Sequence, residues 1–140
     1  MALRKNRKAE LLRSVPLFSE CSKRELGDVA ELADELSVPA GTALMREGER
    51  GREFVVLVEG TVKVTRKGRK VAELGDGDFV GEIALVADVP RTATVVASSP
   101  LRMLVVSDRA FQRLLRQQPA LAAKVMRSLG ERLAAMSAGS

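Results

Sequence analysis

The sequence predicts a mainly β domain with flanking helices (α+β), in which a β jelly-roll barrel lies between N-terminal helices and two C-terminal helices. Eight of the eleven glycines fall between Gly41 and Gly81, so turns follow one another closely in this region. The stretches between these glycines are short and rich in β-branched residues, which favour strands. Both ends of the chain instead carry apolar residues at helical spacing. With 140 residues, the chain is long enough to bury a core of its own.

The N-terminal part is predicted to hold a basic arm and a helix. Residues 1–10 form the arm, whose charges are Arg4, Lys5, Arg7 and Lys8. Ser22 then begins a capping box, with Glu25 three residues later. Apolar residues follow at helical spacing at Leu26, Val29, Ala30, Leu32, Ala33 and Leu36. We therefore expect a helix that begins after Ser22 and includes Leu36.

The predicted strands lie in the middle of the chain. They are Glu53–Glu59, Thr61–Arg66, Val71–Leu74, Thr92–Ser98 and Leu101–Val106. Residues Val55–Val58 are apolar at every position, which is typical of a strand covered on both faces. Basic residues flank Gly68 on both sides, and this cluster indicates the solvated tip of a hairpin.

Two helices are predicted at the C-terminal end. Either Ser107 or Asp108 can cap the first, which carries Phe111 and two leucines. Pro119 lies where a first-turn proline is tolerated and opens the second. The apolar residues of this last helix either pack on the barrel or form the seam of a homodimer: Leu121, Val125, Leu129, Leu133 and Met136. Residues 137–140 are expected to form a flexible tail.

Composition excludes several classes of function. The chain has no His, which rules out Ser-His-Asp and Cys-His catalysis and a His-ligated zinc site. Its one cysteine, Cys21, forms no intrachain disulfide and no cysteine-cluster metal site, so we expect no bound metal. No apolar run approaches the roughly 18 residues of a membrane span, and a cytoplasmic domain is expected. The net charge is +5, but only ten residues follow Gly130, too few for a DNA-docking motif, so direct DNA binding is not expected.

One segment, Phe79–Val96, carries the residues suited to chemistry. A helical turn that starts at Gly81 and Glu82 would point backbone N–H groups outward, and such groups bind anions. Arg91 returns nine residues after Glu82 and can hold the same anion with its guanidinium. Glu82 supplies an acceptor suited to a hydroxyl group. The residue types alone leave open a plain surface salt bridge between Glu82 and Arg91.

The same segment resembles the phosphate-binding cassette of the cyclic nucleotide-binding domain family. Its two halves are Gly81-Glu82-Ile83-Ala84-Leu85 and Pro90-Arg91-Thr92-Ala93-Thr94. Other family-like turns are Val15–Phe18, Val38–Gly41, Glu47-Gly48 and Val58–Gly60. The resemblance covers roughly Leu11 to Leu133, and we assign the domain to residues 11–136. It is closest in character to the domain of bacterial cyclic nucleotide-gated potassium channels.

The resemblance implies a role for each cassette residue. Arg91 would neutralise the cyclic phosphate, and the backbone N–H groups of Ala84 and Thr92 would complete the anion pocket. Glu82 would accept a hydrogen bond from the ribose 2′-hydroxyl, and the backbone of Gly81 would contact the same edge. A side chain at Gly81 would obstruct that approach.

The resemblance also implies contacts to the base. Val64, Leu74 and Ile83 would form an apolar wall, although each can equally be barrel core. The Thr92 hydroxyl can bond the phosphate or the amino group of a syn guanine, so it permits cyclic GMP without requiring it. Arg132 would stack over the purine as a lid, or would be an exposed helix charge.

The resemblance therefore predicts a regulatory sensor for cyclic AMP or cyclic GMP, with no further cofactor. No metal cluster and no general base faces the phosphate, so enzyme activity is not expected. The downstream protein effector is not identified. Two alternatives stay open: a degenerate, ligand-free interaction module, and the effector domain of a transcription regulator without its DNA reader.

Overall fold

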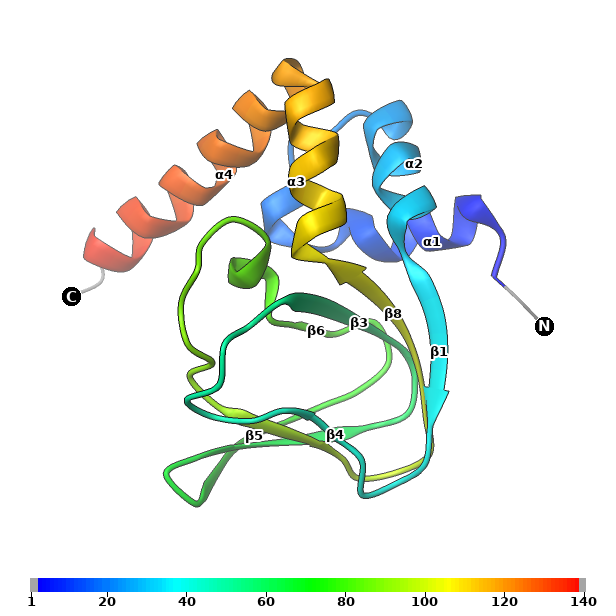
Figure 1. Cartoon of the computed structure of the whole chain (residues 1–140), viewed down its shortest axis with the longest axis vertical. Coiled ribbons are helices and arrows are strands. Elements are labelled where there is room, and N and C mark those ends of the chain that lie inside the picture. The colour runs from blue at the N-terminus through cyan, green and yellow to red at the C-terminus, as the bar shows by residue number, and fades with distance from the viewer. Residues whose placement is uncertain (1–2, 139–140) are drawn as a thin grey trace.

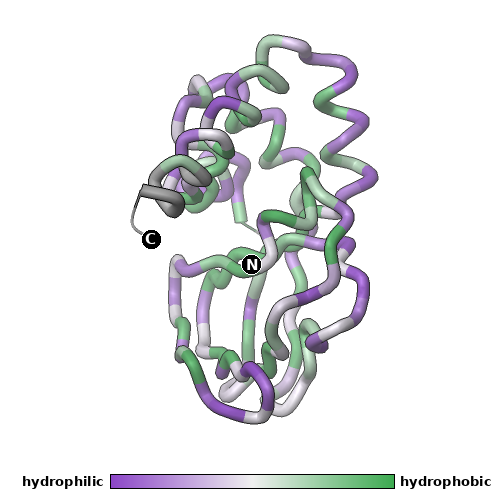
Figure 2. Tube along the Cα trace, turned by 90° about the vertical axis from the view of Figure 1, so that its left-hand side faces the viewer, coloured by the Kyte–Doolittle hydropathy of each residue, from purple (hydrophilic) through white to green (hydrophobic). Residues whose placement is uncertain are grey.

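Two four-stranded antiparallel sheets face each other in a jelly-roll-like arrangement, and all four α-helices lie at one end of it (Figures 1 and 2). The computed structural model describes residues 3–138, with the side chains of residues 3–131 and 134. One sheet has the strand order β1-β8-β3-β6, and the other has the order β2-β7-β4-β5. This arrangement confirms the predicted fold class.

The structure contains a strand at each of the five predicted positions and adds β1, β2 and β6. The strands are β1 (Asp34–Val38), β2 (Ala43–Met45), β3 (Glu53–Glu59), β4 (Val62–Arg66), β5 (Arg69–Leu74), β6 (Phe79–Val80), β7 (Thr94–Ala97) and β8 (Leu101–Ser107). The helices are α1 (Lys5–Arg13), α2 (Lys23–Leu32), α3 (Asp108–Gln117) and α4 (Pro119–Ala138), with the 3-10 turns η1 (Pro16–Phe18) and η2 (Glu82–Leu85).

Strand β3 is covered on both faces, as its continuous apolar run predicts. Val55 and Leu57 belong to the apolar cluster between the two sheets. Phe54 and Val56 alternate with them and belong to the cluster between this sheet and the helices. There Phe18 of η1 meets Phe54 and Phe111 edge to face, with ring centroids 6.0 and 5.7 Å apart. The three rings therefore join the barrel to the helices.

Helix α2 begins as predicted and ends earlier than predicted. The Ser22 hydroxyl accepts from the Glu25 N–H at 3.1 Å, and the Glu25 carboxylate accepts from the Ser22 N–H at 2.8 Å. The helix ends at Leu32, however, and Leu36 lies in β1 opposite Met103. The prediction that Leu36 is helical was therefore wrong. Residues 34–38 form an antiparallel ladder with β8, and the Leu36 side chain is 46% exposed. The helical spacing of Leu36 is therefore coincidental.

The basic arm is part of the folded structure. Helix α1 spans Lys5–Arg13 and so crosses the predicted boundary at residue 10. Its last turn buries Leu11 and Leu12 in the core, which fixes the helix against α2. Lys5 pairs with Glu31 at 2.7 Å, an exposed contact of small energetic value.

The C-terminal helices begin at the predicted residues. Ser107, one of the two candidate caps, accepts from the Ala110 N–H at 3.2 Å. Pro119 is the first residue of α4, whose Leu121 and Val125 are fully buried in the core shared with η1 and α3. Helix α4 continues through Ala138, into the predicted tail. The side chains of Leu133 and Met136, and hence most of the predicted dimer seam, lie outside the described residues.

None of the helices described between residues 3 and 138 combines the length and the apolarity that crossing a bilayer requires.

Candidate functional site

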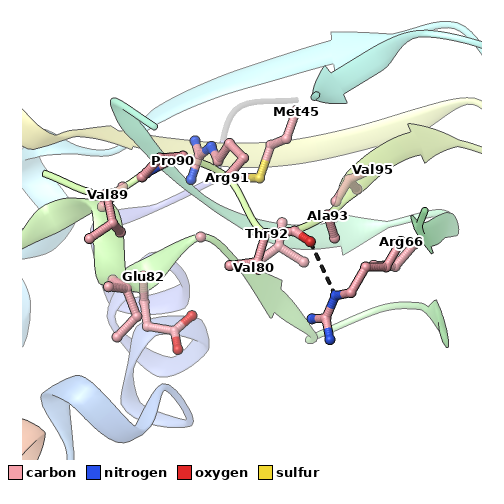
Figure 3. Close-up of a pocket in the computed structure, with 14 residues that line it drawn as sticks. Met45, Arg66, Val80, Glu82, Val89, Pro90, Arg91, Thr92, Ala93 and Val95 are labelled. Atoms are coloured by element: carbon pink, nitrogen blue, oxygen red, sulfur yellow. Dashed lines mark hydrogen bonds between the residues drawn. The ribbon is translucent and has the colours of Figure 1, made fainter. Parts of the chain in front are cut away.

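The predicted cassette surrounds a cavity of about 310 Å³ between the two sheets and η2 (Figure 3). Seven of the predicted site residues line this cavity: Val64, Gly81, Glu82, Ile83, Ala84, Arg91 and Thr92. The structure adds lining residues to which the sequence analysis gave no contact with the ligand: Met45, Arg66, Val80, Val89, Pro90, Ala93 and Val95. Residues distant in sequence are therefore brought together as the motif predicts.

Gly81 begins the turn that shapes one wall of the cavity. Its φ of +83° lies in the left-handed region, which favours glycine. The chain then turns directly into η2, as predicted. The Ala84 N–H, however, donates to the Gly81 carbonyl at 3.1 Å. The donor that the sequence analysis assigned to an anion is thus already used inside the turn.

The Arg91 guanidinium lies between two glycines. A Cβ atom at Gly51 would come within 2.9 Å of its Nε, Cζ and Nη1 atoms, and a Cβ at Gly81 within 2.6 Å of Nη1. Its Nη2 donates to the Glu53 carbonyl at 2.6 Å. Gly81 therefore leaves space for Arg91, a different steric role from the ribose approach that the sequence suggested.

Burial and charge both act on Arg91. The side chain is partly buried, and loss of solvent lowers the pKa of Arg91 below its ordinary value, while the charge of Glu53 raises it. An arginine stays protonated at neutral pH in spite of such a shift. The site therefore holds a partly desolvated positive charge, which is suited to an anionic ligand.

The backbone around Arg91 is fixed by residues 48–50. The Arg91 N–H donates to the Glu49 carbonyl at 2.7 Å, and the Arg91 carbonyl accepts from the Gly48 N–H at 2.8 Å. Arg50 forms a β-bridge with Pro90 and an ion pair with Asp88. These contacts hold the loop before β7 in place and so position the guanidinium.

Glu82 is nearly buried, at 9% exposure, and lies on a different side of Thr92 from the Arg91 guanidinium (Figure 3). Because Arg91 donates to Glu53 and Glu82 is buried, the structure does not support the alternative of an exposed Glu82–Arg91 salt bridge. The two charged groups face separate parts of the cavity. This separation suits a ligand with an anion and a hydroxyl group at different positions.

Two predicted contacts are not placed at the cavity. Leu74 pairs with Val62 at the far end of the β4–β5 ladder and packs against the cluster between the sheets, so it is core rather than cavity wall. Its predicted contact with the base is therefore not supported by this geometry. Arg132 lies on α4, but its side chain is outside the described residues, and its lid role stays a prediction.

Comparison with known proteins decides the family. The family model described as Cyclic nucleotide-binding domain matches residues 35–118, more than half of the chain. The chain belongs to this family. The match runs from within β1 to just past the end of α3 and includes both halves of the cassette.

Relatives of this cyclic nucleotide-binding domain belong to different classes of protein. The chain is 40% identical over 106 residues to a cAMP-dependent protein kinase regulatory subunit of Yarrowia lipolytica, covering 74% of this chain and 28% of the relative. It is 35% identical over 123 residues to a cyclic nucleotide-gated potassium channel of Rhizobium etli, covering 88% and 34%. The chain thus spans about a third or less of these relatives.

A solved structure supports the assignment of the chain to this family. The N-terminal domain of a transcriptional regulator from Streptomyces coelicolor superposes with a TM-score of 0.82 at 29% identity, covering 90% of this chain and 94% of that one. Within the residues that the structure describes, no three His, Cys, Asp or Glu side chains are grouped as a metal site would require.

Proposed function

We propose that this domain is a regulatory sensor that binds cyclic AMP or cyclic GMP in the cavity beside Arg91, without a further cofactor. The observation that carries the proposal is the fixed Arg91 guanidinium between Gly51 and Gly81, at a cavity lined by both halves of the cassette. Its bond to Glu53 uses one donor, and the remaining donors of the guanidinium can bind a phosphate. Thr92, at the rim, supplies a backbone N–H and a hydroxyl to the same ligand.

The rest of the cavity suits the other parts of a cyclic nucleotide. Glu82 would accept from the ribose 2′-hydroxyl, because an ionised carboxylate accepts hydrogen bonds and repels an anionic phosphate. Val64 and Ile83 present apolar surface to the purine. A regulatory role fits this arrangement better than hydrolysis, since Glu82 would face the sugar and would not activate water at the phosphate.

The relatives support ligand binding and leave the output open. Their names include a kinase regulatory subunit, a potassium channel and a transcriptional regulator, so one binding domain serves several effectors. The effector of this chain, a homodimer and a cytoplasmic location therefore stay predictions. A ligand-free interaction module is the competing hypothesis, and it predicts no stabilisation by nucleotide.

Calorimetric titration of cyclic AMP and cyclic GMP tests the proposal. We expect saturable binding of at least one nucleotide, and a loss of about 2–5 kcal/mol of binding free energy in Arg91→Ala. The matched control is Arg113→Ala, which removes the same charge from an exposed position on α3 and should leave affinity unchanged. If neither nucleotide binds at millimolar concentration, the ligand-free hypothesis replaces this one.

A further inference from the structure

Arg66 is a second cation at the cavity, and it comes from β4 rather than from the cassette. Side chains alternate along a strand, so Val62, Val64 and Arg66 point to one face of the sheet. Val62 is buried between the sheets, Val64 lines the cavity, and Arg66 lines it at the solvent side. The strand therefore places a guanidinium next to the apolar wall proposed for the purine.

A hydrogen bond to the cassette orients this guanidinium. The Arg66 Nε donates to the Thr92 carbonyl at 3.1 Å. Among the hydrogen bonds of the described residues, this is the one that Arg66 makes, and it leaves both amino groups available. Figure 3 shows the Arg66 and Arg91 guanidinium groups on opposite sides of Thr92. The two cations are therefore suited to different parts of one ligand.

We propose that Arg66 contacts the base of the bound nucleotide and raises the affinity for cyclic GMP relative to cyclic AMP. This inference rests on the proposed function and adds a selectivity residue to it. A guanidinium has donors only, and guanine offers two adjacent acceptors, O6 and N7. Adenine has an amino donor beside its N7 acceptor, and a guanidinium has no acceptor for a hydrogen bond from that amino group. Arg66 thus matches the guanine edge with two bonds and the adenine edge with one.

The dissociation constants of cyclic GMP and cyclic AMP test this selectivity in four proteins: the wild type, Arg66→Ala, Arg66→Lys and Arg69→Ala. Arg69 is the matched control, because it lies opposite Arg66 in the same hairpin, carries the same charge and does not line the cavity. We expect Arg66→Ala to weaken cyclic GMP binding about tenfold more than cyclic AMP binding. Arg66→Lys should also lose this preference, because an ammonium group does not form the two parallel bonds.

The ratio of the two affinities separates a base contact from other roles. Loss of simple charge, or of a Thr92 contact to the phosphate that both nucleotides share, would weaken both nucleotides equally, and stacking on the ring would also ignore base identity. Equal losses, or no loss, would overturn the inference while leaving the proposed function intact. If the wild type binds neither nucleotide, both fail. Melting temperatures without ligand show that the variants are folded.

Discussion

At the scale of single residues, the site depends on the space that Gly51 and Gly81 leave for Arg91. The two glycines differ in backbone conformation. Gly81 has a left-handed φ of +83°, whereas Gly51 is outside that region. Substitution at Gly51 therefore tests the position of the guanidinium with little backbone strain.

We predict that Gly51→Ala weakens nucleotide binding about ten- to a hundredfold, because the new Cβ displaces the Arg91 guanidinium from the Glu53 carbonyl. The obstructing atoms belong to the end of a flexible side chain, so the fold can accommodate the methyl group. Calorimetry and thermal unfolding should show reduced affinity at an unchanged or slightly higher melting temperature. Unchanged affinity would show that the position of Arg91 does not limit binding.

Gly81→Ala should instead destabilise the fold itself. An L-residue in the left-handed region costs about 1–2 kcal/mol, and its Cβ would lie 3.0 Å from the Glu53 carbonyl oxygen and 2.8 Å from Met45 Cε. Chemical denaturation should show this loss without any ligand present. Gly77→Ala is the control: Gly77 has a similar φ of +86°, and a Cβ there meets nothing within 4 Å. Equal losses in the two variants would mean that crowding at Gly81 is unimportant.

At the scale of elements, α4 is tied to the helices beneath it by polar contacts. Lys124 donates to the Glu25 carboxylate at 2.7 Å, and Arg127 pairs with Glu20 at 3.2 Å. The hydrogen bond from Lys124, followed by that from the Ser22 backbone, lowers the pKa of Glu25 below its ordinary value. Glu25 therefore caps α2 and holds α4 at the same time.

The lowered pKa of Glu25 predicts a pH dependence. A carboxylate whose pKa is lower in the folded state stabilises the fold above its ordinary range of about 4.3, and loses this contribution as the pH falls through the folded-state value. Glu25→Gln keeps a side chain that completes the capping box but removes the charge. Denaturation should show the variant to be less stable at pH 7, by about 1 kcal/mol or less, with the difference shrinking towards pH 3. A difference independent of pH would contradict the ion pair.

Sequence reasoning succeeded where a local interaction determines the structure. The Ser22–Glu25 box and Pro119 involve neighbouring residues, and both helices begin where these residues predict. Leu36 was misplaced because pairing with β8, a contact distant in sequence, overrides helical spacing. Leu74 was predicted as either base contact or barrel core, because apolar character alone does not distinguish the two, and in the structure it packs against the cluster between the sheets.

The site followed the same pattern. The cassette residues are close in sequence and share a motif, whereas the contacts of Gly51 with Arg91 and of Arg66 with Thr92 are revealed only by the tertiary structure. A signal for Arg66 was present, because strand alternation places it on the same face as Val64.

At the scale of the whole molecule, the contacts of α4 bear on signalling. A sensor responds only if its ligand binds one conformation better than another. If α4 moves to close over the base, as the predicted Arg132 lid requires, it leaves its contacts with Glu20 and Glu25, so these contacts oppose ligand binding. Glu25→Gln should then raise nucleotide affinity by a few-fold while lowering stability at pH 7. Calorimetric titration of Glu25→Gln with nucleotide measures this change in affinity. Unchanged or weaker affinity would contradict a movement of α4 on ligand binding.

The most direct test of the central claim is a crystal structure of the chain with the cyclic nucleotide that binds it more tightly. The account predicts the cyclic phosphate within hydrogen-bond distance of the Arg91 guanidinium, the ribose at Glu82 and the purine beside Val64 and Arg66. A nucleotide bound away from this cavity, or a phosphate with no contact to Arg91, would contradict it.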